Sequence, residues 1–243
     1  MTRLHVAAEL TAGTVIDLPP QTAAHVAKVL RSHGGDPVIL FNGDGREYQG
    51  VIEYVRGTRV QAAVGPGIEV DREPPLAVTL VQCLPRGDRM DFIVQKATEL
   101  GVRRIVPVLS QRSVVRLDAA QGRTKVDHWR AVAINACEQC GRNRLPLVDA
   151  PDTLMNFLGR AGTAASRVLL DPEAPLSPFS PVGEIEVAVG PEGGFADEER
   201  EAFRLAGFSG IRLGPRILRS ETAALVALAW LQGRFGDMSG AVP

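Results

Sequence analysis

Cysteine is scarce in this chain of 243 residues, which contains three: Cys83, Cys137 and Cys140. A small, odd number of cysteines excludes a disulfide framework as the basis of the fold. Cys137 and Cys140 have the spacing of a zinc pair, but zinc needs two more thiolate or imidazole ligands, and the four histidines are scattered. The pair ends an expected helix at 124–140, whereas redox pairs stand at a helix start. We therefore expect no metal site and regard the cysteine spacing as incidental.

The sequence also lacks long apolar runs. No stretch approaches the ~20 apolar residues that cross a bilayer. The first residues, Met-Thr-Arg-Leu-His-Val, lack the continuous apolar region of a signal peptide. Hydrophobic residues make up 45% of the chain and charged residues 23%, which is typical of a globular protein with a sizeable core. These features favour a cytoplasmic protein without membrane contact.

Several nucleotide-binding and catalytic motifs are missing. There is no GxxxxGK(S/T) phosphate loop, and the glycines between 190 and 194 lack the GxGxxG spacing of dinucleotide-binding proteins. Ser220 does not stand in a GxSxG motif, and no histidine follows it. The sequence therefore disfavours a nucleoside triphosphatase, a dinucleotide-dependent enzyme and a serine hydrolase.

Net charge is small, at −1, but the charges are unevenly distributed. The segment 82–145 contains twelve lysines and arginines against six acidic residues, so the rest of the chain is acidic. Phosphate contacts supply most of the non-specific affinity of proteins for nucleic acid. A basic segment in a near-neutral protein thus predicts a localised polyanion surface, to which we assign Arg103, Arg104 and Arg112. A solvated face with scattered ion pairs would have the same composition.

Two glycine loops stand at the ends of successive expected strands in the last third of the chain. The apolar run 184–189 stops at the first loop, 190–195, and an expected helix at 196–206 follows with acidic residues in its first turn. A short strand at 211–213 leads into Gly214-Pro-Arg and a long helix expected from Ile217 to Gln232. Glycine lets the main chain approach a ligand that a β-carbon would exclude. Together the loops predict a ligand held by main-chain groups, although either loop alone fits an ordinary turn.

The order of expected elements divides the chain at the charged and doubly prolyl segment 68–75. Before it, a helix at 22–31, a hairpin turn at 42–45 and several short strands are typical of a small β-barrel; the strands are 37–41, 46–55 and 59–64. After it, strands and helices alternate, which predicts a mainly parallel sheet with helices on both faces. We expect domains at 1–72 and 73–243, with the ligand at the carboxyl ends of the strands.

The words GPEGGF at 190–195 and LGPRILRSETA at 213–223 resemble one family, the bacterial 16S rRNA uridine N3-methyltransferases of the SPOUT class. The segment 25–31 resembles, less specifically, the PUA-like N-terminal domain of the same family, and Glu138-Gln139 with Arg142 is similar to its EQ-x-x-R word. The resemblance implies an α/β protein: an N-terminal PUA-like small β-barrel that binds RNA, and a C-terminal SPOUT domain with a trefoil knot.

The resemblance also implies a cofactor, partners and site residues. S-adenosylmethionine would be held by the two loops and the end of the strand 167–170, through Leu170, Gly190, Pro191, Glu192, Gly193, Gly194, Leu213, Gly214, Ile217 and Leu218. The implied partners are 16S rRNA in the small ribosomal subunit and a second copy of the chain, with the long helix from Ile217 suited to the dimer interface. Arg31 and Arg142 join the arginines of the basic segment as candidate RNA contacts.

Methyl transfer to uridine N3 makes three demands. The methyl carbon must lie in line with N3, the N3 proton must leave, and the charge developing on N3, O2 and O4 must be stabilised. Arg142 or Arg219 is the expected stabiliser, while Glu192 is either a base or a carboxylate that holds its loop. The general base stays open. So do two other functions: a SPOUT methyltransferase acting on a ribose 2′-hydroxyl or another base, and a non-catalytic RNA-binding assembly factor.

Overall fold

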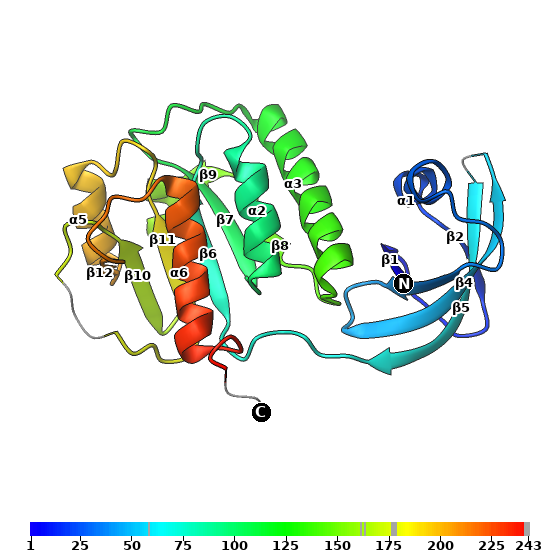
Figure 1. Cartoon of the computed structure of the whole chain (residues 1–243). Helices are drawn as coiled ribbons and strands as arrows, with labels where there is room; N and C mark the ends of the chain where they lie inside the picture. The colour runs from blue at the N-terminus through cyan, green and yellow to red at the C-terminus, as the bar shows by residue number, and fades with distance from the viewer. Residues whose placement is uncertain (58, 161, 163, 176–178, 241–243) are drawn as a thin grey trace. The chain divides into compact units, whose positions relative to one another are not determined.

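The computed structural model describes every residue except 58, 161, 163, 176–178 and 241–243. The chain forms two compact units, both drawn in Figure 1. Unit 1 consists of residues 1–73 and 134–145, and unit 2 of residues 74–133 and 146–243. The chain therefore returns to unit 1 after the first part of unit 2, which the order of elements did not indicate. The expected domains at 1–72 and 73–243 stay a prediction.

Unit 1 is built on one five-stranded, mostly antiparallel sheet. Its elements are β1 (Thr2–His5), β2 (Val15–Asp17), α1 (Pro20–Ala24), the π-helical turn η1 (His25–Leu30), β3 (Pro37–Phe41), β4 (Arg46–Arg56) and β5 (Arg59–Glu69). The strand order is β1-β3-β4-β5-β2, and β1 pairs in parallel with β3. Leu4, Leu40 and Ile52, all 0% exposed, belong to its core. In the described residues the ladder runs from β1 to β2, and its closure into a barrel stays a prediction.

Two local predictions for unit 1 have different outcomes. The hairpin turn at 42–45 is confirmed, because it joins the antiparallel strands β3 and β4 and Gly43 and Gly45 have φ of +97° and +95°. The helix expected at 22–31 begins instead at Pro20, since the fixed φ of proline suits the first helical residue, and it is π-helical from His25. It ends at Leu30, and Arg31, which follows, is the single described non-glycine residue with a positive φ, +51°.

Unit 2 contains a parallel sheet whose strands alternate with helices. Its elements are β6 (Val78–Cys83), α2 (Arg89–Glu99), β7 (Arg104–Leu109), α3 (Ala119–Cys140, whose last turns belong to unit 1), β8 (Leu147–Val148), β9 (Asp152–Thr153), α4 (Leu154–Leu158), β10 (Ser166–Leu170), β11 (Ile185–Val189), α5 (Asp197–Leu205), β12 (Ser209–Ile211) and α6 (Ser220–Phe235). The order is β12-β10-β11-β6-β7-β8, with β9 beside β7. All these pairs are parallel, which confirms the expected α/β class.

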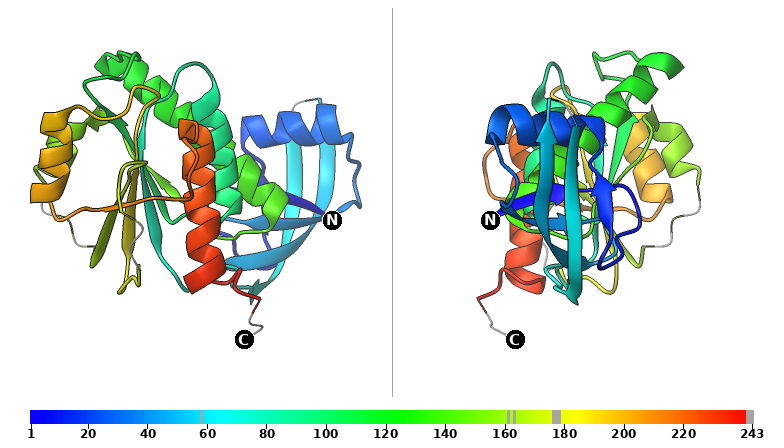
Figure 2. Two further views of the ribbon diagram at one scale, coloured as in Figure 1. Left: turned by 60° about the vertical axis from the view of Figure 1, so that its left-hand side comes forward. Right: turned by 90° about the vertical axis from the view of Figure 1, so that its right-hand side faces the viewer.

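Helices cover both faces of this sheet. α2, α3 and α6 lie on one face (Figure 1), and the left view of Figure 2 shows the sheet between α6 and α5. Neighbouring strand residues point to opposite faces. In β6, Leu80 packs in the cluster with α2, α3 and α6, and Val81 packs in the cluster with α4 and α5. Because the sheet is buried on both sides, its strand ends are the parts that can carry a site.

Two helix boundaries differ from the expected ones. The helix expected from Ile217 begins at Ser220, because Arg219 is still extended, with φ −64° and ψ 154°. The helix expected from Thr124 begins at Ala119, because the Asp118 carboxylate accepts hydrogen bonds from the N–H groups of the residues that follow. Neither these helices nor any other in the described residues is long and apolar enough to cross a membrane.

Candidate functional site

A cavity of about 540 Å³ lies at the carboxyl ends of β10, β11 and β12, three neighbouring strands of unit 2. Leu170 and Asp171 come from the end of β10, Val189 and Gly190 from the end of β11, and Ile211 from the end of β12. The strand order reverses beside β6, since β7 and β8 extend one side of the sheet and β11, β10 and β12 the other. Ligands of open parallel sheets bind near such a reversal. The cavity lies where the two glycine loops begin, as the sequence predicts.

The first glycine loop, 190–196, is anchored to α5 by aromatic packing. Phe195 is 4% exposed, and its ring packs edge-on against Phe203 with centroids 4.8 Å apart. A β-carbon at Gly190 would lie 3.0 Å from the Phe195 ring, so this position favours glycine for space. Gly194 has φ of +66°, which favours glycine for its backbone conformation. The loop is thereby fixed against α5 while its other side lines the cavity.

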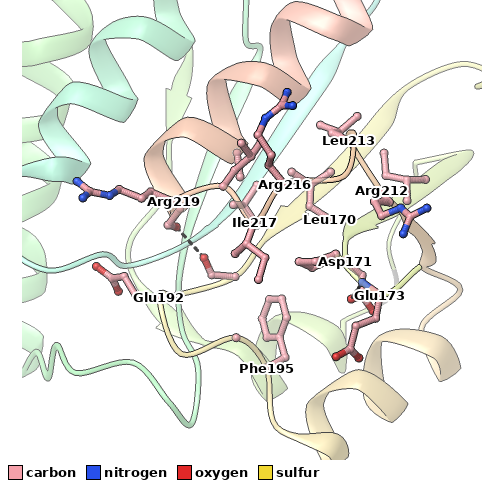
Figure 3. A pocket seen from close by; sticks show the side chains of 18 of the residues that line it. Leu170, Asp171, Glu173, Glu192, Phe195, Arg212, Leu213, Arg216, Ile217 and Arg219 are labelled. Atoms are coloured by element: carbon pink, nitrogen blue, oxygen red, sulfur yellow. Dashed lines mark hydrogen bonds between the residues drawn. The ribbon is translucent and has the colours of Figure 1, made fainter. Parts of the chain in front are cut away.

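The second loop, 212–219, presents apolar side chains to the cavity. β12 ends at Ile211, so Leu213, expected in the strand, belongs to the loop. Leu213, Ile217 and Leu218 all line the cavity, and Figure 3 labels the first two. Ile217 is 85% exposed. Gly214 has φ of +76°, and no heavy atom lies within 4 Å of a β-carbon built on it. The loop therefore exposes both main chain and apolar surface to a ligand.

All the residues expected to hold a cofactor line this cavity except Gly193. The Gly193 carbonyl instead accepts a hydrogen bond from Arg112 Nη1, at 3.1 Å. The structure thus gathers residues from three separate stretches of the chain into one wall, while their role in binding stays a prediction. Gly193 does not line the cavity but connects the first glycine loop to Arg112, in the segment that follows β7.

The wall expected at the end of the strand 167–170 carries carboxylates for which no role was predicted. Asp171 and Glu173 line the cavity, and the Asp171 carboxylate is 2.5 Å from Arg200 Nη1 of α5. Figure 3 shows these two acidic side chains on one side of the cavity and Glu192 and Arg219 on the other. The available signal was positional, because Asp171 directly follows the apolar strand β10 at its carboxyl end. Each side of the cavity therefore carries a carboxylate, and Arg212 and Arg219 lie on opposite sides (Figure 3).

Glu192 is held by the segment that follows β6. Its Oε1 lies 2.6 Å from Arg89 Nη1 and accepts the main-chain N–H of Arg86 at 3.4 Å. Arg89 Nε is also 3.7 Å from Glu221, in the first turn of α6. One arginine at the start of α2 thus contacts both the first glycine loop and the first turn of α6. These contacts favour the loop-holding interpretation of Glu192 over its interpretation as a base.

Arg219 is the expected catalytic residue with the most accessible guanidinium. It is exposed, lines the cavity and directly precedes α6. Within the described part of the chain, no carboxylate lies within 4.0 Å of it. Its five N–H donors are therefore available to a negatively charged group at the cavity.

Arg142, the other expected catalytic arginine, lies in unit 1 and is 4% exposed. Its Nε donates to Glu73 Oε1 at 3.0 Å, and its Nη2 donates to Glu73 Oε2 at 2.5 Å. A two-bond arginine–carboxylate pair is a strong and directional contact. These contacts favour a structural role for Arg142, and its catalytic and RNA-binding roles stay predictions.

A second ion-pair cluster in unit 1 surrounds Glu47 of β4. Its carboxylate is 2.5 Å from a guanidinium nitrogen of Arg3 and 2.5 Å from one of Arg72. Arg3 also donates to Asn143 Oδ1 at 2.5 Å. Burial alone would raise the pKa of Glu47, but the two arginines outweigh burial and hold the pKa below its usual value. The cluster connects β1 and β4 to the returning segment 134–145.

The arginines expected to bind RNA in unit 2 lie at opposite edges of the sheet. Arg103 and Arg104 stand at the amino end of β7, where they pair with Glu184 at 3.0 Å and Asp149 at 2.7 Å. Arg112 follows the carboxyl end of β7 and contacts the first glycine loop. The strand between the two edges is about 17 Å long at ~3.3 Å per residue. Their RNA-binding role stays a prediction, but the geometry places only Arg112 at the edge that carries the cavity.

The cysteine pair lies outside the cavity, in unit 1. Burial raises the pKa of the Cys137 thiol to about 12, and its Sγ donates to the main-chain carbonyl of Arg144 at 3.7 Å. A thiol with so high a pKa is a poor nucleophile and a poor metal ligand near neutral pH. Among the described residues, no three His, Cys, Asp or Glu side chains are grouped to hold a metal ion.

Comparison with known proteins identifies the family. The RNA methyltransferase domain model matches residues 72–232, and the RNA methyltransferase PUA domain model matches residues 18–64. The ribosomal RNA small subunit methyltransferase E of Bacillus subtilis strain 168 is 34% identical to this chain over 84% of each protein. The chain belongs to the small subunit methyltransferase E family. The family resemblance predicted from the two glycine-loop words is thereby confirmed, as is the PUA-like nature of the N-terminal part.

Two solved structures are close to this member of the small subunit methyltransferase E family. The family protein of Neisseria gonorrhoeae, crystallised bound to S-adenosyl methionine, has a TM-score of 0.92 and 36% identity, covering 98% of this chain and 99% of that one. A Legionella pneumophila protein, solved with the bound cofactor SAM, has a TM-score of 0.93 and 38% identity, covering 97% and 98%. The fold is therefore that of the methyltransferase E family over nearly its whole length.

Proposed function

We propose that this chain transfers a methyl group from S-adenosylmethionine to N3 of a uridine in 16S, small-subunit ribosomal RNA. The observation that carries the proposal is the cavity that two glycine loops build at the carboxyl ends of β10, β11 and β12. Family membership supports the reaction class, and the neisserial and Legionella relatives were crystallised with this donor. The choice of uridine N3 rests on the resemblance of the two loop words alone.

The residues around the cavity suit this donor. The volume of the cavity lies within the range of small-ligand pockets, roughly 300–1,000 Å³. Leu213, Ile217 and Leu218 offer apolar surface for an adenine ring, and the glycine loops offer main-chain donors and acceptors. Asp171 and Glu173 offer carboxylate oxygens, which accept hydrogen bonds from ribose hydroxyls or from an ammonium group. The groups that line the cavity therefore match a ligand with one apolar part and several polar hydrogens.

The chemistry divides the remaining tasks among few side chains. When bound, the donor supplies a methyl carbon on a positively charged sulfur, which N3 must meet in line. Uridine N3 loses its proton, and the resulting negative charge spreads over N3, O2 and O4. We assign the stabilisation of that charge to Arg219, whose guanidinium is exposed at the cavity. Glu192 is committed to Arg89, so we assign it to holding the first loop, and the base that takes the proton stays open.

RNA would meet the protein along the carboxyl edge of the unit 2 sheet and on unit 1. Exposed arginines without an ion pair in the described part of the chain lie in the segments after β6, β7 and β12: Arg86, Arg112, Arg116, Arg216 and Arg219. Such cations suit RNA phosphates. The PUA-like unit 1 supplies a second contact, for which Arg31 is the exposed candidate. A homodimer and a trefoil knot around the donor complete the proposal, and both rest on the family resemblance.

Product mapping tests the function. The full chain, in excess over small-subunit RNA, is incubated with methyl-labelled S-adenosylmethionine in a single turnover, and the modified nucleoside is identified by mass spectrometry. We expect one N3-methyluridine per RNA. A 2′-O-methyl nucleoside or another methylated base would replace the proposed specificity, and donor binding without any transfer to naked RNA or assembled subunits would favour a non-catalytic assembly factor.

A further inference from the structure

A buried glutamine stands near the carboxyl end of β6, the strand beside β11. Gln82 is 0% exposed, in a strand whose other residues are mostly apolar. Its Nε2 donates to the carbonyl of Cys83 at 2.8 Å and to Ser220 Oγ at 2.9 Å. A buried amide costs stability unless its polar atoms are hydrogen-bonded. Both protons of this amide are committed to named partners.

The hydrogen bonds at Ser220 run in one direction. Ser220, the first residue of α6, donates from Oγ to the carbonyl of Gly190 at 2.6 Å. The carbonyls of Cys83 and Gly190 can only accept, so the amide atom facing Cys83 is the nitrogen, and the one hydroxyl proton of Ser220 goes to Gly190. The order Gln82 to Ser220 to Gly190 is therefore fixed by chemistry.

This relay connects the parts of the chain that build the cavity. Gly190 opens the first glycine loop, Ser220 directly follows the second as the first residue of α6, and Gln82 comes from the strand beside β11. Gln82 Oε1 has no hydrogen-bond donor within the described residues, so a buried acceptor is left at a cost. What the site needs from this residue is its two protons, which glutamate or methionine would not supply.

We propose that Gln82 and Ser220 are positioning residues for methyl transfer. Their hydrogen bonds fix the Gly190 carbonyl and so keep the two glycine loops in one position relative to each other around the donor. The inference rests on the proposed function of the cavity and adds residues to it. Without the relay, the first loop is free to shift against α6. Donor binding then weakens, and the methyl carbon loses alignment even when the site is saturated.

A matched pair of variants isolates the hydroxyl. Ser220→Thr keeps the hydroxyl that donates the hydrogen bond. Ser220→Val has the shape of threonine but lacks the hydroxyl. S-adenosylmethionine is titrated by calorimetry into each full-length variant, and thermal unfolding of the free protein is recorded beside it. We expect Ser220→Thr to bind within about threefold of wild type. Ser220→Val should bind about tenfold or more weakly, because the Gly190 carbonyl loses its buried donor and the Gln82 amide loses its acceptor. At saturating donor, single-turnover transfer should fall about tenfold in Ser220→Val and not in Ser220→Thr.

Gln82 provides the second arm. Gln82→Met, of similar length, removes both donated hydrogen bonds, and its effect on donor affinity should resemble that of Ser220→Val. The double variant should be no worse than the poorer single variant, because both changes break one relay. Additive losses would show two independent effects and overturn the proposal.

The remaining outcomes separate this inference from the proposed function. If wild type fails to bind S-adenosylmethionine, the donor assignment of the cavity falls, and the relay with it. If wild type binds and the threonine and valine variants bind equally well, the relay is overturned while the donor site stands. If both Ser220→Val and Gln82→Met fail to fold, the hydrogen bonds serve the fold instead of the loops, which also overturns the proposal.

Discussion

Arginines at the two edges of the unit 2 sheet have opposite surroundings. At the amino edge, Arg103 and Arg104 form ion pairs with Glu184 and Asp149 on exposed surface. At the carboxyl edge, Arg219 lines the cavity with no ion pair in the described part of the chain. An exposed pair contributes only about 0–1 kcal/mol to stability, but it neutralises a charge that an RNA phosphate would otherwise meet.

The difference shows that an arginine's position relative to the strand ends decides whether it lies near the cavity. The number of basic residues in a segment does not. The basic segment 82–145 contributes arginines to both edges, and to unit 1 as well, where Arg142 is paired with Glu73. Only those that follow a strand end lie at the edge of the sheet that carries the cavity, because parallel strands bring all their carboxyl ends to one edge. A count of charges along the sequence cannot separate these groups.

The largest expected effect is on chemistry at the carboxyl edge. Arg219→Ala should slow single-turnover transfer by roughly 100-fold or more, because it removes a donor to the charge that develops on the base. Arg219→Lys should recover little, since an ammonium does not reproduce the planar guanidinium. Donor affinity, measured by calorimetry, should stay within about threefold in both.

Arg103→Ala is the matched control for this experiment, because it removes an equal charge at the amino edge and should leave the rate within about twofold. Near wild-type rates in Arg219→Ala would remove this residue from the chemistry. A loss of donor affinity in place of rate would assign Arg219 to donor binding.

The next effect is on RNA affinity. The double variant Arg86→Ala/Arg116→Ala at the carboxyl edge should lower the slope of log affinity against log salt by about 1.8, since each lost phosphate contact removes about 0.9. The double variant Arg103→Ala/Arg104→Ala at the amino edge should leave the slope unchanged, although the net charge falls equally. Both are measured by filter binding with small-subunit RNA between low and moderate salt. Equal slopes for the two double variants would show that the edges do not differ.

The smallest effects are expected on stability and donor affinity, when two carboxylates that each pair with an arginine are changed to glutamine. Glu184→Gln frees Arg103 at the amino edge and should change the free energy of unfolding by less than about 1 kcal/mol in urea titration, with no change in donor affinity. Glu192→Gln weakens the tie to Arg89 at the carboxyl edge and should weaken donor binding severalfold with similarly small loss of stability. If both variants bind the donor as wild type does, Glu192 does not hold the loop.

Much of the cavity could be predicted from the sequence because its signals are local. The run 185–189 is mostly apolar and rich in β-branched residues, and glycine and proline follow it directly, so the sequence predicts a strand followed by a loop. The rule that parallel sheets carry ligands at their carboxyl ends then placed the site. Asp171 also follows a strand end, but a single acidic residue there has no distinctive spacing, so no role for its carboxylate was predicted.

Contacts between distant residues could not be predicted in the same way. Gln82 and Ser220 are 138 residues apart, and Arg142 and Glu73 are 69 apart. Nothing in the neighbours of Arg142 indicates that Glu73 holds it, so the family word suggested a site residue where the structure places a buried ion pair in unit 1. The return of 134–145 to unit 1 depends on the same kind of long-range contact, through Arg3 and Asn143.

By itself, the sequence determined the α/β class, the positions of the two glycine loops and the family, because backbone preference and hydrophobic period act over a few residues and are written in order along the chain. Only the tertiary structure decided which arginines form ion pairs, which arginines line the cavity, and which hydrogen bonds connect Gln82 and Ser220 to Gly190. Ion pairs and hydrogen bonds depend on distance in space. The pairing of strands in a sheet brings together residues that are far apart along the chain, and that separation does not reveal their distance in the fold.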